Sequence, residues 1–218
     1  MARFYKRSLI GCLGMALLLA SSACSVGPDR RTIRSIRATE GLDGGRLEAR
    51  PNLVAYRTEA STHAEILATD LTIDQLDPAV GFEGIRGQIT RIRMFTRPVA
   101  GKTPLSNAAG NSIVQHVVIN DGALAVYGGA GLLRPRGRPG ETVLDAVLSN
   151  GTVRLTRSTP GLVDPIGTAR LDLAMSAALN APLSRLIAAR LDQIIETTQP
   201  RLETDDARAE ADAREDAP

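Results

Sequence analysis

The chain of 218 residues has two cysteines, two histidines, three tyrosines, three phenylalanines and no tryptophan. Both cysteines, Cys12 and Cys24, lie near the N-terminus, so no disulfide can form in the rest of the chain. A domain without disulfides must be held by its own apolar core, and residues 51–198 are long enough to bury one. Because aromatic side chains are so few, a stacking platform for bases or sugars is not expected.

The balance of charge also argues against a nucleic-acid partner. The whole chain has a formal net charge of +2, but three of its 26 basic residues, Arg3, Lys6 and Arg7, stand within the first seven positions. Residues 24–218 therefore hold 23 bases against 24 acids, a net charge of −1. Proteins that bind nucleic acid through its phosphates normally present an excess of positive charge.

The N-terminus has the pattern of a secretory signal. The three bases are followed by an apolar run from Leu9 to Ala20. Thirteen residues separate Arg7 from Ser21, whereas a membrane-spanning helix needs about 20 apolar residues. The pattern predicts that residues 1–23 are a signal peptide and not a transmembrane anchor.

The sequence Ala20-Ser21-Ser22-Ala23-Cys24 comes directly after this run. It resembles the lipobox of bacterial lipoproteins, although Ser21 stands where leucine is commonest. The resemblance implies cleavage before Cys24 and acylation of its thiol, so that the membrane is contacted through a lipid anchor. Ser25 resembles the sorting signal of outer-membrane lipoproteins that face the periplasm. The alternative is that an ordinary signal peptidase uses Ser21-x-Ala23 and releases a soluble periplasmic protein.

Composition divides the rest of the chain into three parts. Residues 24–50 are rich in Arg, Gly and Asp, which predicts a lipidated N-terminus and a flexible tether. Residues 51–198 are predicted to be one β-rich envelope domain that ends in a helix. Residues 199–218 are predicted to be a disordered acidic tail, because the segment from Glu196 to Pro218 holds eight acids and three arginines.

Within residues 51–198 apolar and polar side chains mostly alternate, with turn residues about every ten positions. The pattern predicts a mainly β fold: an antiparallel sheet of about eight strands, as a sandwich or partly closed barrel, with one C-terminal amphipathic helix. Asn-Gly or Asp-Gly between apolar runs predicts hairpin turns at residues 120–122 and 149–151. The expected strands are 52–58, 63–73, 88–97, 112–119, 123–127, 143–148, 152–157 and 169–179.

The last strand and the helix each have an apolar stripe. Asn180 and Pro182 are suited to begin the helix. Because the connection is short, we expect the two stripes to cover one another. The strand stripe is Leu171, Leu173, Met175, Ala177 and Leu179, and the helix stripe is Leu183, Leu186, Ile187, Leu191, Ile194 and Ile195.

The sequence has few candidates for catalysis or metal binding. His63 and His116 lie in expected strands without a zinc-ligand spacing, and no Gly-x-Ser-x-Gly elbow is present. Residues 128–131 (Gly-Gly-Ala-Gly) match no phosphate-binding loop and predict a bulge or corner between strands. Asp70, Asp74 and Asp77 predict turn capping, since their spacing matches no calcium loop. We expect neither a metal nor a cofactor.

Two groups of arginines are candidate contacts for anions, lipid phosphates or an acidic partner. One lies in a stiff loop with two prolines, and the other is the polar side of an expected strand. The alternative for both is an ordinary solvated surface. The first group is Arg134, Arg136 and Arg138, and the second is Arg91, Arg93 and Arg97.

Two functions follow from this sequence. The first is a non-catalytic envelope lipoprotein that acts as a scaffold or assembly factor and binds another envelope component. The second is a carrier or sensor of an apolar ligand, such as an acyl chain, held between the sheet and the helix. A hydrolase is the least favoured class.

Overall fold

The computed structural model describes residues 31–35, 46–48, 50–60, 63–95, 110–164 and 166–200. The predicted signal peptide, Cys24, Arg97 and residues 201–218 of the predicted tail lie outside these ranges. The described elements are β1 (Arg31–Ser35), β2 (Arg46–Glu48), β3 (Leu53–Ala60), β4 (His63–Thr69), η2 (Asp74–Leu76), β5 (Arg86–Met94), β6 (Ser112–Asn120), β7 (Ala123–Arg136), β8 (Val143–Ser158), β9 (Ala169–Leu179), α1 (Ala181–Thr197) and β10 (Gln199–Pro200).

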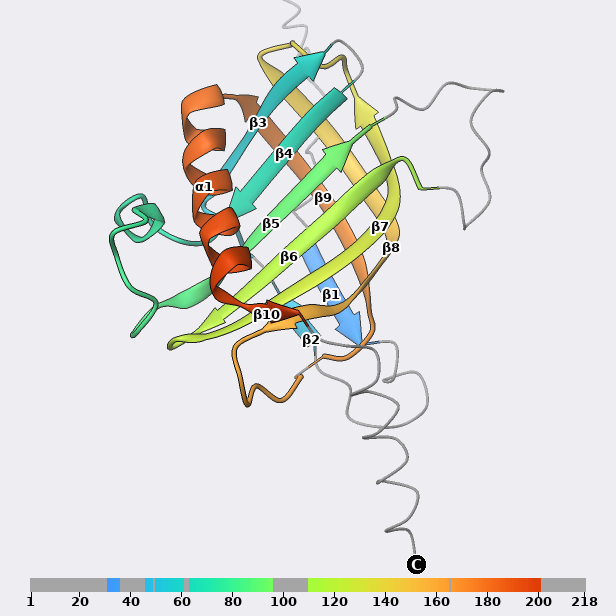
Figure 1. Ribbon diagram of the computed structural model, residues 1–218. Helices are drawn as coiled ribbons and strands as arrows, with labels where there is room; N and C mark the ends of the chain where they lie inside the picture. Colours follow the sequence, from blue (N-terminus) through green and yellow to red (C-terminus); the bar gives the residue numbers. More distant parts are fainter. Residues whose placement is uncertain are drawn as a thin grey trace, which may run out of the picture.

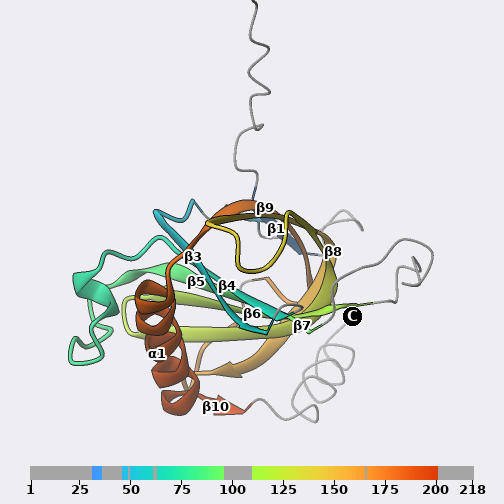
Figure 2. The same cartoon turned by 90° about the horizontal axis from the view of Figure 1, so that it is seen from above.

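Strands β3 to β9 run up and down in sequence and curl into a ring, with α1 outside it (Figure 2). Each strand pairs antiparallel with the next, and β9 also meets β3 through Ala55↔Ala178 and Tyr56↔Leu179. This last pairing is parallel, because the first and seventh strands of an alternating series point the same way. The fold is mainly β with one C-terminal helix, as predicted, but the sheet is mixed and not purely antiparallel.

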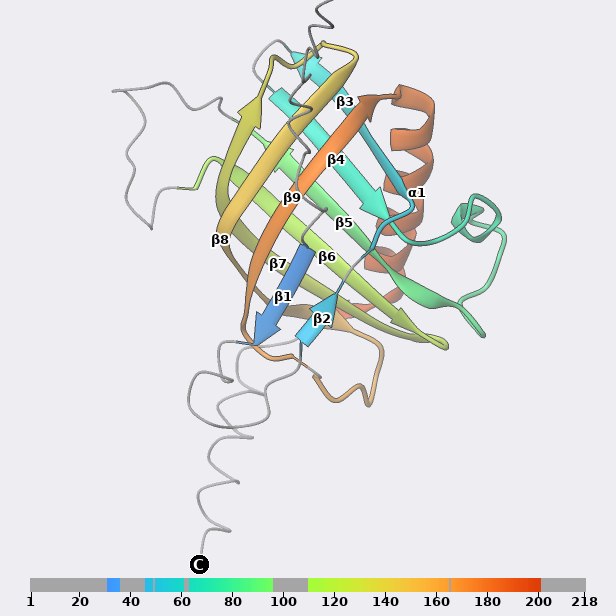
Figure 3. The ribbon, with the colours of Figure 1, turned by 180° about the vertical axis from the view of Figure 1, so that it is seen from behind.

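The ring is only partly closed. β3 and β9 share two residue pairs at one end, and the first five residues of β9 pair on that edge with β1, from Arg31↔Leu173 to Ser35↔Ala169. β2 pairs in turn with β1, so these two strands extend the sheet beside the ring (Figure 3). The predicted tether over residues 24–50 is therefore wrong for residues 31–35 and 46–48. β10 pairs with the end of β8, so the predicted disordered tail is also wrong for residues 199 and 200.

The ring has two ends, named here as they stand in Figure 1. At the upper end β3 ends and β4 begins, β5 ends and β6 begins, β7 turns into β8, and β9 ends. The lower end holds the β4–β5, β6–β7 and β8–β9 connections. The chain therefore leaves β9 at the upper end and enters α1 there.

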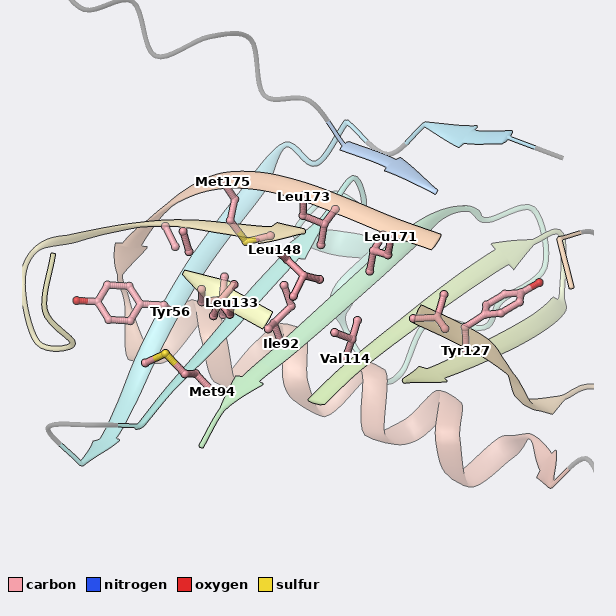
Figure 4. Packing of buried hydrophobic residues seen from close by; sticks show 14 of the residues in the cluster. Tyr56, Ile92, Met94, Val114, Tyr127, Leu133, Leu148, Leu171, Leu173 and Met175 are labelled. Carbon is pink, nitrogen blue, oxygen red and sulfur yellow. The ribbon is translucent and has the colours of Figure 1, made fainter. Parts of the chain in front are cut away.

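The interior of the ring is filled by one apolar cluster, part of which Figure 4 shows. Tyr56 lies toward one end of this cluster and Tyr127 toward the other, with the aliphatic side chains between them. The fully buried members include Tyr56, Ile92, Val114, Tyr127, Leu133, Leu144, Val153 and Leu171. Side chains thus pack this interior as a core.

A second apolar cluster joins α1 to the outer face of the ring. Ile187, Leu191 and Ile194 are fully buried there beside residues of β4 to β7 such as Leu67, Ile89 and Val117. The predicted helix stripe is confirmed, but the predicted partner is wrong. Leu171, Leu173, Met175 and Ala177 of β9 face the ring interior, on the other side of the sheet. The short connection turns the chain over the upper rim to the outer surface.

The hairpin at residues 120–122 is confirmed, since Asp121 and Gly122 both have positive φ between β6 and β7. The hairpin predicted at residues 149–151 is wrong, because β8 runs straight through it. Asn150 has φ +55° but Gly151 does not share the positive φ that a type I′ turn requires. Instead a bulge forms in β8, and the Asn150 amide donates to Asp172 Oδ1 at 2.9 Å.

The predicted start of the helix is confirmed. The side chain of Asn180 accepts a hydrogen bond from the amide of Leu183 at 3.0 Å, and Pro182 lies in the first turn. At the other end Thr198 donates its hydroxyl to Ile194 O at 2.9 Å, and Arg157 donates to Thr198 O at 2.6 Å. The contact from Arg157 of β8 thereby fixes the end of the helix to the sheet.

Candidate functional site

A cleft of about 660 Å³ lies at the lower end of the ring. It is lined by residues of β2, β5, β6 and β7 and by the connections before β5 and after β8. The lining is mostly apolar, with polar side chains at the lower rim. The residues are Leu47, Asp70, Arg86, Gly87, Gln88, Val118, Ile119, Asn120, Ala123, Ala125, Leu162 and Val163.

Gln88 and Asp70 form the polar part of the cleft wall. The backbone amide of Gln88 donates to Asp70 Oδ1 at 2.6 Å, and its side-chain Nε2 donates to Glu48 O at 3.4 Å. Burial raises the pKa of the Asp70 carboxyl, and the hydrogen bond from Gln88 opposes that rise. Gln88 Oε1 is buried, and no described residue donates a hydrogen bond to it. This wall therefore has an acceptor that the described protein leaves unused.

Three hydrogen bonds to one oxygen of Asp164 stiffen the lower end of the ring. The Tyr127 hydroxyl donates to Asp164 Oδ1 at 2.9 Å, and the amides of Ile166 and Gly167 donate to the same oxygen. This fixes the β8–β9 connection over the lower end, with Ile166 in the core. Val163, one residue before Asp164, is 86% exposed at the rim of the cleft.

His116 is a structural residue of the interior. It is fully buried, its Nδ1 lies 2.9 Å from Thr90 Oγ1, and its ring centroid is 6.4 Å from that of Tyr127. Burial lowers its pKa to about 4, so the ring is neutral near pH 7. No described group of three His, Cys, Asp or Glu side chains is close enough together to hold a metal ion.

Two of the six predicted arginines are neutralised by the chain's own carboxylates. Glu65 is 3% exposed and lies among Arg57, Arg91 and Arg93; its Oε1 is 3.0 Å from Arg91 Nε and 3.1 Å from Arg93 Nε. Arg91 also binds Asp192 of α1 with two hydrogen bonds of 2.8 and 3.3 Å. Arg91 is thus a buried connector between sheet and helix, while the Arg93 side chain is 53% exposed.

The other predicted arginines occupy a different place. Arg134 and Arg136 lie in β7, which reaches beyond the start of β6, and Arg138 lies in the turn to β8. All three are exposed, and no described carboxylate forms an ion pair with any of them. The structure therefore keeps Arg134, Arg136 and Arg138 together on the upper end and separates them from Arg91.

The remaining sequence predictions fall on structural features. β7 is irregular between Ala130 and Leu132, which agrees with the bulge predicted at residues 128–131. Asp77 Oδ1 accepts the amide of Ala79 at 2.9 Å, as expected of a turn cap. The space between sheet and helix, where a ligand was predicted, is occupied by the buried side chains of α1. No local pattern in the sequence pointed to the cleft, whose residues come from separate segments between Leu47 and Val163.

Comparison with known proteins returned no match: no protein-family model, no curated protein and no solved structure is significantly similar to this chain. Among the described residues, no helix is long and apolar enough to cross a membrane.

Proposed function

We propose that this protein is a non-catalytic lipoprotein of the bacterial cell envelope that carries or senses an apolar ligand in the cleft at the lower end of the ring. In this proposal the chain is acylated at Cys24 and sorted to the periplasmic face of the outer membrane. The observation that carries the binding function is the cleft itself. Its volume of about 660 Å³ lies within the roughly 300–1,000 Å³ typical of small-molecule sites.

The lining defines the chemistry of the ligand. Leu47, Val118, Ala125 and Leu162 offer apolar surface, which favours a hydrocarbon segment. Arg86 is the one base among the lining residues and can pair with a carboxylate or phosphate at the end of such a segment. An acyl chain with an acidic head group has both features.

A scaffold is the second candidate function, and the exposure of Val163 favours it. An aliphatic side chain that is 86% exposed at the rim of an apolar cleft can contact a partner larger than the cleft. In that case the cleft would receive apolar side chains of another envelope protein, and the lipid anchor would hold the complex at the membrane.

The carrier function is tested with a fluorescent fatty acid added to the mature chain that begins at residue 24 and carries Cys24→Ala. Saturable binding is expected, and native mass spectrometry should find a lipid in protein purified from its host. Ala123→Phe fills the cleft and should lower the affinity at least tenfold. The matched control is Ala178→Phe, at an exposed position of β9 outside the cleft. Equal binding by wild type and Ala123→Phe, or no binding at all, would exclude the cleft as a lipid site and leave the scaffold function.

The anchor has a separate test. Metabolic labelling with an alkyne fatty acid should mark the wild-type chain in membranes, and Cys24→Ala should lose both the label and membrane retention. A soluble, unlabelled wild type would show that an ordinary signal peptidase processes the chain.

A further inference from the structure

We infer that the outer surface at the upper end of the ring docks on an anionic lipid surface, so that the cleft at the lower end points away from the membrane. This inference rests on the proposed lipid anchor at Cys24. The docking surface is defined here as Phe95, Ile113, Arg134, Arg136, Arg138 and Val143.

The docking surface combines apolar and cationic side chains on neighbouring strands. Phe95, Ile113 and Val143 are 46%, 52% and 49% exposed. Phe95 donates its amide to Asn111 O, so it lies beside the start of β6, and Ile113 pairs with Ala130 of β7. Further along β7, Arg134 pairs with Val147 and Arg136 with Asp145 of β8. Arginines beside exposed aliphatic and aromatic groups can place the apolar parts in the interface and the guanidiniums among the phosphates.

The connections at the two ends of the ring differ in charge. The three connections at the lower end, residues 70–85, 121–122 and 159–168, hold six acids and no base. At the upper end the docking surface holds three arginines. The β7–β8 hairpin there also holds two acids, the exposed Glu141 and the half-exposed Asp145. An anionic membrane therefore attracts the arginines of the upper end, while the acids of the three lower connections oppose contact there, which turns the domain about its anchor.

The direction of β1 agrees with this orientation. β1 begins at Arg31 opposite Leu173 and ends at Ser35 opposite Ala169, so its first residue is the one nearer the upper end. Seven residue steps separate Cys24 from Arg31, a reach of at most about 25 Å. The six steps of β9 from Leu173 to its end at Leu179 measure about 20 Å. An acylated Cys24 can thus lie level with the docking surface, but it cannot hold the domain far from the bilayer.

The absence of tryptophan from the chain permits a direct test with single reporters. Phe95→Trp places the only indole on the docking surface, and Val163→Trp is the matched reporter at the exposed rim of the lower end. Both are made in the mature chain with Cys24→Ala, so docking is measured without the lipid anchor. On vesicles of phosphatidylethanolamine and phosphatidylglycerol the indole emission of Phe95→Trp is expected to shift to the blue and to be quenched by brominated lipid. The emission of Val163→Trp should stay unchanged.

The contribution of charge is tested with matched double variants. Arg134→Gln together with Arg136→Gln should lower the partition coefficient onto these vesicles by roughly 30-fold, since each arginine near an anionic surface contributes about a factor of five. Arg50→Gln together with Arg170→Gln removes the same charge from exposed positions away from the upper end and should change it less than threefold. Binding of the wild type should also weaken as salt is raised and be lost on phosphatidylcholine vesicles.

Each outcome decides the inference. A blue shift in the emission of Val163→Trp, with none in that of Phe95→Trp, would reverse the orientation. Equal effects of the two double variants would show that Arg134 and Arg136 do not contribute specifically to docking. Binding to polyglutamate but not to vesicles would indicate that this surface docks on an acidic protein and not on a membrane. Acyl labelling of Cys24 without any vesicle binding by the unacylated chain would refute the docking surface while leaving the proposed anchor intact.

Discussion

Arg91 of β5 and Asp192 of α1 are joined by two parallel hydrogen bonds, Nη1 to Oδ1 at 2.8 Å and Nη2 to Oδ2 at 3.3 Å. The pair connects residues 101 positions apart and fixes the helix to the outer face of the ring. Its two members differ in burial, because the Arg91 side chain is 7% exposed and that of Asp192 is 54% exposed. Removal of the Arg91 side chain should therefore destabilise the fold more than removal of the Asp192 side chain.

We expect Arg91→Met to destabilise the fold by about 3 kcal/mol, since it removes a buried cation from between two carboxylates. Arg93→Met, two residues along the same strand, removes an exposed cation that also contacts Glu65 and should cost less than about 1 kcal/mol. Urea unfolding followed by circular dichroism gives both values. Similar losses for the two variants would show that Arg91 is no more than a surface ion pair.

The helix stripe makes a second prediction. Leu191→Asp buries a carboxylate among Leu67, Ile89 and Val117 and should cost at least about 3 kcal/mol, enough to unfold a marginal domain. Leu186 is only partly buried, so Leu186→Asp should cost less. Ala189→Asp, at an exposed position of the same helix, is the control. If Leu191→Asp melts like Ala189→Asp, the helix does not hold the fold together.

The stripe also shows how far the sequence could predict this fold. Period-two alternation located β3, β5, β6 and β9, and the Asn-Pro start located α1, because these signals are local. An apolar stripe indicates that its helix or strand packs against another element, but it does not indicate which element that is. Both faces of β4 to β7 are apolar. One face packs in the ring interior and the other packs against α1, while the apolar stripe of β9 faces the interior. The sequence could not show this division.

Other features depend on contacts distant in sequence. β1 and β2 are short and rich in charge, and only the free edge of β9 makes them strands. At residues 149–151 the hairpin signal failed because β7 and β9 pair with both halves of β8, which favours a bulge over a turn. Among the candidate sites, the basic segment with Arg134, Arg136 and Arg138 was visible from local composition, although Arg134 and Arg136 lie in β7 and not in a loop as expected. The cleft was not, since it forms only when the ring assembles.

The bulge at Asn150 gives a third prediction. Its φ of +55° is a conformation that Asn and Gly adopt easily and β-branched residues do not. Asn150→Gly should leave stability within about 0.5 kcal/mol, whereas Asn150→Val should cost about 2 kcal/mol. Thermal unfolding of both variants, with Thr152→Val as the control in the exposed part of the same strand, measures the difference. A tolerated valine at position 150 would mean that β8 can straighten there.

Gly129 lies where β7 and β8 approach one another closely. A Cβ atom at this position would lie 1.8 Å from Thr152 O, a backbone atom that cannot turn away. At Gly128 the nearest atom is Thr156 Cγ2 at 3.0 Å, the end of a side chain. Gly129→Ala should therefore cost more than about 3 kcal/mol, and Gly128→Ala about 1 kcal/mol or less. Chemical unfolding of the two neighbouring variants tests this, and equal stability would show that the strands separate freely.

His116 predicts how stability depends on pH. Burial lowers its pKa in the folded state to about 4, while an unfolded chain has the ordinary value near 6.5. Between these values the unfolded state binds a proton that the folded state does not, so stability is complete above pH 6.5 and falls as pH drops toward 4. The loss over this window should be roughly 3 kcal/mol.

Carboxylates titrate in the same range, so the contribution of His116 must be isolated by a variant. Thr90→Val with His116→Leu removes both partners of the buried hydrogen bond and leaves no donor or acceptor unpaired between them. The difference in unfolding free energy between about pH 7 and about pH 4 should be smaller in this variant than in the wild type by about 3 kcal/mol. In parallel, NMR of the wild type should show the His116 ring still neutral at about pH 5, where an ordinary histidine is protonated. Identical pH profiles for variant and wild type would mean that water reaches His116 and that the interior of the ring opens below the ordinary pKa of histidine.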